Sequence, residues 1–115
     1  MEKVLKYSIL RYSPFSLPDK EAVLGILFSE ETIGYHSFYY IQDLTQIQSF
    51  DDQLDLSILQ DLLIGISEEA KETKFDIDSF IKFYINDYKF DKPRIITYQD
   101  LKETIATIKK VYFKS

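Results

Sequence analysis

The sequence predicts an α+β fold in which an antiparallel β-sheet, a three-stranded N-terminal meander plus one short late strand, has about three helices packed on it. Two observations support this prediction. Three early segments are rich in β-branched and aromatic residues and are separated by short polar breaks, at 4–12, 22–28 and 33–41. Later segments repeat apolar residues three and four positions apart, as amphipathic helices do. The expected order is β-β-β-α-α-β-α, in one domain that spans residues 1–115.

The first two strands are expected at the centre of the sheet. Alternation over 4–12 places Leu5, Tyr7, Ile9 and Arg11 on one face and Lys6, Ser8, Leu10 and Tyr12 on the other. Both faces are mixed, so we expect cover on both sides of this strand near its centre. AVLGILF at 22–28 is a continuous apolar run that fits a central strand, and Gly25 within it predicts a bulge or a close backbone approach.

The third strand of the meander is expected over residues 33–41. Tyr35, Tyr39 and Ile41 fall on one face, opposite His36, Phe38 and Tyr40. The residues that follow, 42–50, fit either a short strand or a turn of helix.

Helices are expected after the meander. Residues 51–72 repeat seven apolar residues at helical spacing: Leu54, Ile58, Leu59, Leu62, Leu63, Ile66 and Ala70. Asp76 is the expected N-cap of a second helix over 77–89, which Pro93 ends. A short strand follows at 94–97. Thr97 with Asp100 then predicts a capping pair for a last helix, whose apolar side holds Leu101, Ile105, Ile108 and Tyr112.

Composition excludes several kinds of protein. The 115 residues include no cysteine, which excludes disulfides, thiolate zinc sites and cysteine nucleophiles and favours a cytoplasmic location. No apolar run approaches the ~20 residues that cross a bilayer, so we expect no membrane span. The net charge of −5 is uneven, with eleven acidic residues and one basic residue between 21 and 72. This acidic middle argues against direct binding to a nucleic-acid backbone and is typical of a solvated surface.

The usual patterns for catalysis and metal binding are missing. His36 is the only histidine, and the sequence contains no G-x-S-x-G elbow, Walker loop or dinucleotide fingerprint. Asp51, Asp52 and Asp55 lie close together, but they lack the glycine and the ligand spacing of a calcium loop, and a helix N-terminus explains them. We therefore expect no enzyme activity, no metal and no cofactor.

Arg11 is the first candidate binding residue, because arginine is the usual residue for bidentate contact with carboxylates and phosphates. If residues 4–12 and 21–29 form a hairpin, Glu21 lies nearly opposite Arg11, and an internal ion pair would satisfy the guanidinium. This structural pair is the favoured interpretation. The alternative is an anion-binding or enzymatic domain centred on Arg11.

Tyr35 and Tyr39 are further candidates, since an exposed tyrosine row is typical of a protein-binding patch. Cross-strand packing explains the same row and is favoured, and base stacking is disfavoured because the nearest basic residues are Lys20 and Lys71. The last helix also has a basic end, formed by Lys102, Lys109, Lys110 and Lys114. These lysines either complement the helix dipole or form a docking surface for an acidic partner.

The N-terminal part of the chain contains the motif Tyr7-Ser8-Ile9-Leu10-Arg11-Tyr12-x-Pro14, followed by an acid at Glu21 and by VLGILF at 23–28. This pattern resembles that of a bacterial domain of unknown function. Members of that family open with Tyr-Ser-(Val/Leu/Ile)-(Leu/Val)-Arg-Tyr-x-Pro and end in a short strand and an amphipathic helix. This chain departs from the family at Val23, where members tend to have Asn, and in the loop before Glu21, where Ser-Leu-Pro-Asp-Lys replaces Arg-Gly. Because members are often encoded beside HipA-like kinases, the resemblance implies an accessory role in a toxin–antitoxin or defence-related system, and it does not imply an enzyme activity.

Three functions are compatible with these observations. The first is a small non-catalytic interaction module, bacterial or phage-borne, that modulates a protein partner such as a HipA-like kinase. The second is a phage-encoded acidic inhibitor of a nucleic-acid-binding defence effector, which would use Glu30, Glu31, Asp51 and Asp52. The third is the domain centred on Arg11. The first is favoured, and the oligomeric state is left open.

Overall fold

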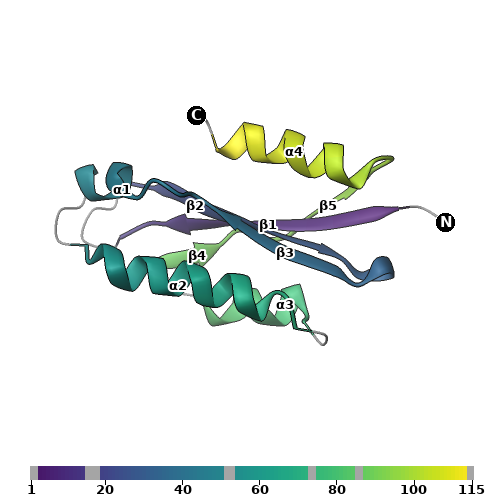
Figure 1. The fold of residues 1–115 in the computed structure, drawn as a ribbon, viewed down its shortest axis with the longest axis horizontal. Helices are drawn as coiled ribbons and strands as arrows, with labels where there is room; N and C mark the ends of the chain where they lie inside the picture. Colours follow the sequence, from purple (N-terminus) through teal and green to yellow (C-terminus); the bar gives the residue numbers. More distant parts are fainter. Residues whose placement is uncertain (1–2, 15–18, 51–53, 73–74, 85–86, 114–115) are drawn as a thin grey trace.

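An antiparallel sheet lies between two layers of helices (Figure 1). The computed structural model describes residues 3–14, 19–50, 54–72, 75–84 and 87–113. The strands are β1 (Val4–Tyr12), β2 (Ala22–Glu30), β3 (Tyr35–Tyr40), β4 (Tyr88–Phe90) and β5 (Arg94–Thr97). Their order is β3-β2-β1-β4, and β5 also pairs with β1. The predicted antiparallel meander is therefore confirmed, in a sheet of five strands where the sequence predicted four.

β4 and β5 lie one after the other along the same side of β1. Leu10 pairs with Phe90 in β4, and Tyr7 pairs with Arg94 in β5. The register shifts by one residue between these pairs, so the chain bulges over 91–93, where Pro93 is tolerated. The Asp91 N–H still donates to the Ile9 carbonyl at 2.8 Å. The two short strands thus act as one interrupted edge strand.

The predicted helix over 77–89 is wrong in its second half. Helix α3 (Ile77–Phe80) is followed by a 3₁₀ turn, η2 (Ile81–Phe83), and Tyr88–Phe90 then forms β4. The Tyr88 ring stacks on that of Tyr12 with centroids 5.1 Å apart, and β4 satisfies backbone groups of β1. Pairing with a strand far away in the sequence therefore overrides the local helical spacing.

The remaining helices are α1 (Thr45–Phe50), α2 (Leu56–Glu69) and α4 (Leu101–Tyr112), with a 3₁₀ turn, η1 (Glu31–Ile33), between β2 and β3. The ambiguous stretch 42–50 thus holds a helix. Asp55 caps α2, Asp76 caps α3 as predicted, and Asp100 caps α4 by accepting a hydrogen bond from the Glu103 N–H at 3.0 Å. Asp51 and Asp52, predicted to begin the first helix, lie outside the described residues. None of the helices described is long and apolar enough to cross a membrane.

The two faces of the sheet bury separate apolar clusters, and this confirms the expected cover on both sides of β1. Leu10 and Tyr12 of β1 pack with residues of α2 and α3, whereas Leu5, Tyr7 and Ile9 pack against Ile105 and Ile108 of α4. In Figure 1 these helices lie on opposite sides of the sheet.

Gly25 makes the close approach that the sequence predicts. A Cβ atom at this position would lie 2.4 Å from Cζ of Phe38 and 2.8 Å from the carbonyl oxygen of Tyr39. Only a residue without a side chain lets β3 pack this closely on β2. The β1–β2 register also shifts beside Gly25, between Leu10 and Arg11.

Candidate functional site

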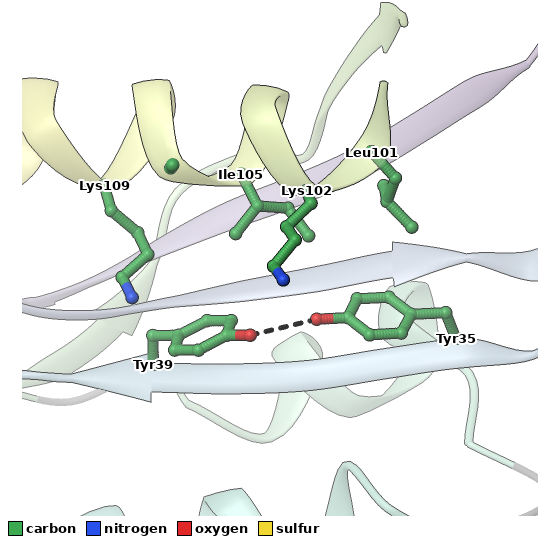
Figure 2. Close-up of a pocket in the computed structure, with 7 residues that line it drawn as sticks. Tyr35, Tyr39, Leu101, Lys102, Ile105 and Lys109 are labelled. Atoms are coloured by element: carbon green, nitrogen blue, oxygen red, sulfur yellow. Dashed lines mark hydrogen bonds between the residues drawn. The ribbon is translucent and has the colours of Figure 1, made fainter. Parts of the chain in front are cut away.

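The candidate site is a groove of about 510 Å³ between β3 and α4 (Figure 2). Its lining is Tyr35 and Tyr39 from the strand and Leu101, Lys102, Ile105, Ala106 and Lys109 from the helix. Leu101 and Ile105 belong to or pack against the apolar cluster under α4, and they make the wall of the groove apolar. The sequence predicted the two tyrosines as binding residues, and the structure brings both to this groove.

Local periodicity places each lining residue. Alternation along β3 turns Tyr35, Ser37 and Tyr39 toward the face of the sheet that α4 covers. On α4, Lys102, Ala106 and Lys109 follow one another at intervals of four and three residues, so they lie along one side of the helix. The site therefore forms where a strand face and a helix flank run beside each other.

Three hydroxyl groups of β3 form a hydrogen-bonded row. The Ser37 hydroxyl donates to Tyr35 Oη at 2.8 Å, and the Tyr35 and Tyr39 hydroxyls lie 3.1 Å apart. Burial raises the pKa of Tyr35, so this phenol stays protonated at neutral pH. The row therefore presents neutral hydroxyl donors to the groove.

Two lysines of α4 place positive charge above this row. Lys109 Nζ lies 4.1 Å from the centroid of the Tyr39 ring, a cation–π contact. Figure 2 shows Lys102 reaching from α4 toward the two tyrosine hydroxyls. Within the part of the chain that the structure describes, neither ammonium has a carboxylate oxygen within 4.0 Å. The groove is therefore a basic site on a chain of net charge −5.

The outer edge of β3, beside this groove, is open. Among the described residues, β3 pairs only with β2. The Ile41 N–H donates to the Leu24 carbonyl at 2.9 Å, and in an antiparallel pair this bonding alternates along the strand. The N–H and C=O groups of His36 and Phe38 therefore point away from β2, and Tyr40 follows the same alternation. The Gln42 side chain donates to the Tyr40 carbonyl at 3.2 Å, which leaves His36 and Phe38 as the open part of the edge.

Arg11 and Glu21 lie elsewhere, at the end of β1 that pairs with β4. Arg11 Nη1 donates to Glu21 Oε1 at 3.0 Å, which is the predicted ion pair. Arg11 Nε donates to both carboxylate oxygens of Asp91 at 3.0 Å. Sequence reasoning missed Asp91, because the bulge that brings it to Arg11 follows a strand that was expected to be helix. Two carboxylates thus balance this guanidinium within the sheet, and this arrangement favours the structural interpretation.

The serine–histidine pair of the chain spans β2 and β3, with the serine buried and the histidine half-buried. Ser29 Oγ and His36 Nδ1 lie 2.8 Å apart across the β2–β3 pair, and Ser29 is 1 % exposed. The His36 ring packs on Phe75 with centroids 5.3 Å apart. A substrate could not reach the Ser29 hydroxyl in this arrangement, so we assign the pair a packing role.

An acidic cluster lies at the opposite end of β1 from Arg11. Glu31, Asp76 and Asp78 have carboxylate oxygens within 4.8 Å of one another, and all three residues are exposed. Lys6 Nζ lies 2.8 Å from Asp78 and 3.9 Å from Glu31, so an ammonium already pairs with two of the three carboxylates. We assign no metal to it.

Asp55, one of the three aspartates weighed above as calcium ligands, is the N-cap of helix α2.

Glu30 is a buried carboxylate, although the inhibitor hypothesis counts it among the acids presented to a partner. It is 1 % exposed and accepts hydrogen bonds from the Thr32 N–H at 2.9 Å, from the Thr32 hydroxyl at 2.6 Å and from the Tyr98 hydroxyl. Burial raises its pKa, but the hydrogen bonds from Thr32 and Tyr98 outweigh burial and leave the pKa of Glu30 below its ordinary value. Glu30 therefore acts inside the fold and does not belong to an acidic surface that a partner could contact.

The chain matches no family model, no curated protein and no solved structure in the three comparisons made with known proteins. The resemblance of residues 7–28 to a bacterial domain family stays an expectation. The function is therefore inferred from the groove, the open edge of β3 and the distribution of charge.

Proposed function

We propose that the chain is a small, non-catalytic protein-interaction module that binds its partner along the open edge of β3. The observation that supports this most directly is the edge itself: β3 is a six-residue strand, YHSFYY, with no lysine, acid or proline. Natural sheets usually protect an edge with such residues, because unpaired N–H and C=O groups pair readily with another chain. A partner segment that adds a strand here would gain main-chain hydrogen bonds, with the groove beside it to accept side chains.

The resemblance suggests where to look for the partner. Members of the family that the N-terminal motif resembles are often encoded beside HipA-like kinases. A kinase of that type, in a toxin–antitoxin or defence-related system, is therefore the first partner to test. In that setting the chain would be an accessory or modulator of the kinase.

A pair of substitutions at His36 tests the role of the edge. His36→Pro removes the outward N–H and puts a pyrrolidine ring on the edge, and the fold tolerates it because proline is accepted on edge strands. His36→Ala loses the same contacts with Ser29 and Phe75 but keeps the N–H. We expect the tagged His36→Ala variant to co-purify with the same partner as the wild type, and the His36→Pro variant to lose it.

Circular dichroism of both variants verifies the fold in this comparison. If His36→Pro is folded and retains the partner at wild-type yield across several salt concentrations, the partner does not use the open edge of β3, and the proposed binding mode is wrong. If the wild type retains no specific partner under any of these conditions, the interaction role itself is contradicted.

A further inference from the structure

We propose that the segment which adds to β3 is an acidic strand whose carboxylates are held in the groove by Tyr35, Tyr39, Lys102 and Lys109. This inference rests on the interaction role proposed above and specifies the chemistry of the partner. Three observations support it: the one hydroxyl hydrogen that the tyrosine row leaves unused, the positive charge of the two lysines, and the distance between these lysines along α4.

The hydroxyl row has one hydrogen more than its internal bonds use. Ser37, Tyr35 and Tyr39 carry one hydroxyl hydrogen each, and the Ser37 hydrogen goes to Tyr35 Oη. The bond between Tyr35 and Tyr39 uses one more, whichever of the two donates. One tyrosine hydrogen is therefore left for an acceptor outside the row, and a carboxylate oxygen is a strong acceptor for it.

The lysines select an anion as that acceptor. Lys102 and Lys109 line the same groove and have no carboxylate within 4.0 Å among the described residues. A neutral side chain in the groove would leave both ammoniums without a counter-charge. A carboxylate instead gains charge-assisted hydrogen bonds from them, while the apolar wall of Leu101 and Ile105 limits its access to water.

The spacing of the site suits an extended segment with alternating acids. Alternate side chains of an added strand point to the same face and recur about every 7 Å. Lys102 and Lys109 are seven residues apart on α4, which is about 10 Å along a helix, and flexible lysine side chains cover the difference. Two acids at alternate positions of one strand can thus each meet a lysine.

Synthetic peptides test this inference directly. An alternating Val-Glu peptide of about ten residues is titrated against the full chain by fluorescence anisotropy, beside Val-Gln and Val-Lys peptides of the same length. We expect the Val-Glu peptide to bind at least about tenfold more tightly than the Val-Gln peptide, and the Val-Lys peptide not to bind.

Matched variants locate the binding. Lys102→Gln with Lys109→Gln should weaken the Val-Glu peptide about tenfold, whereas Lys110→Gln, an exposed lysine of the same helix outside the groove, should leave it unchanged. Tyr35→Phe combined with Tyr39→Phe, which keeps both rings and removes both tyrosine hydroxyl hydrogens, should weaken it about threefold to tenfold. His36→Pro should abolish binding of the peptide.

Several results would overturn the inference. Equal binding of the Val-Glu and Val-Gln peptides, no binding of either at about 1 mM, or an equal effect of Lys110→Gln and the groove double variant would each do so. Tighter binding of a single-stranded oligonucleotide at the groove, or a dimer in sedimentation that His36→Pro dissociates, would assign the site to a nucleic acid or to a second copy of the chain. The proposed function is tested separately, by co-purification with the His36→Pro variant. The outcome of that test does not depend on the charge of the peptide that binds.

Discussion

The two edges of the sheet differ in charge and in regularity. The edge made by β4 and β5 is broken by a bulge, contains Pro93 and carries Lys89, Lys92 and Arg94. The edge made by β3 is continuous over six residues and carries no charge. The first edge has three of the devices by which natural sheets prevent further pairing, and the second has none of them. This difference indicates that one edge is closed to other chains and the other is kept open.

The positively charged side chains near the two edges also differ, in whether a carboxylate pairs with them. Arg11, beside the closed edge, is balanced by Glu21 and Asp91, whereas the lysines of the groove beside the open edge have no such partner among the described residues. Paired charges fix the position of a bulge, and charges without a carboxylate nearby are available to a ligand. The predictions below test this contrast, from the largest expected effect to the smallest.

Gly25→Ala should damage the open edge most. The added methyl group would lie 2.4 Å from the Phe38 ring and 2.8 Å from the Tyr39 carbonyl, so β3 must shift away from β2. We expect the free energy of unfolding, measured with urea, to fall by about 3 kcal/mol. Gly65→Ala is the control, because nothing lies within 4 Å of a Cβ there and the residue is in α2, so it should stabilise the chain by about 0.5–1 kcal/mol. Equal effects of the two substitutions would contradict the close packing of β3.

Arg11→Ala should have a moderate effect at the closed edge. It leaves the carboxylates of Glu21 and Asp91 without their counter-charge, but all three side chains are partly exposed to solvent. We therefore expect a loss of about 1 kcal/mol in the free energy of unfolding and normal binding of the partner by the folded protein. A variant of wild-type stability that binds no partner would instead assign Arg11 to the binding site.

Glu21→Gln separates the two ion pairs of Arg11. It removes only the more exposed partner, so the loss should be about 0.5 kcal/mol or less in the same urea experiment. A loss larger than that of Arg11→Ala would show that Glu21 has a further role in the fold.

The pH dependence of stability should report on Glu30, which joins the turn before β3 to Tyr98 after β5. Its pKa is lowered in the folded chain, so the ionised carboxylate stabilises the fold above the unfolded-state pKa, about 4.3. This contribution is lost as the pH falls through the folded-state pKa. Thermal unfolding of Glu30→Gln should therefore depend less steeply on pH below about 5 than that of the wild type. Parallel curves for the two proteins would show that Glu30 contributes nothing to acid unfolding.

Local signals in the sequence predicted much of the fold. The alternation in β1 and β3, the close approach at Gly25 and the capping acid Asp76 each depend on neighbours within a few residues. The cap of α4 was predicted in part, because Asp100 alone is the N-cap and Thr97, its expected partner, ends β5. The strand at Tyr88–Phe90 was missed because its apolar spacing also fits a helix, and only pairing with β1 decides between the two.

The sequence predicted only part of the site, because the site also depends on contacts between distant segments. Alternation marked Tyr35 and Tyr39, but Lys102 and Lys109 were grouped with other lysines as a basic C-terminal end of the last helix, whereas Lys102 lies in the first turn of α4. No local pattern shows that α4 lies beside β3. Asp91 could not be assigned to Arg11, because the bulge that joins them exists only when β4 and β5 both pair with β1. Contacts between distant segments are the part of this structure that the sequence does not reveal.

Residue-resolved amide hydrogen exchange tests the open edge of β3 most directly. In the free protein, the N–H groups of Ser37 and Tyr39 should be protected by their bonds to β2, while those of His36 and Phe38 should exchange fast. At saturating Val-Glu peptide, exchange at His36 and Phe38 should slow by at least about tenfold, because the added strand accepts these hydrogens. Protection of His36 and Phe38 in the free protein equal to that of Ser37 and Tyr39, or no change in their exchange when the peptide is bound, would contradict strand addition at this edge.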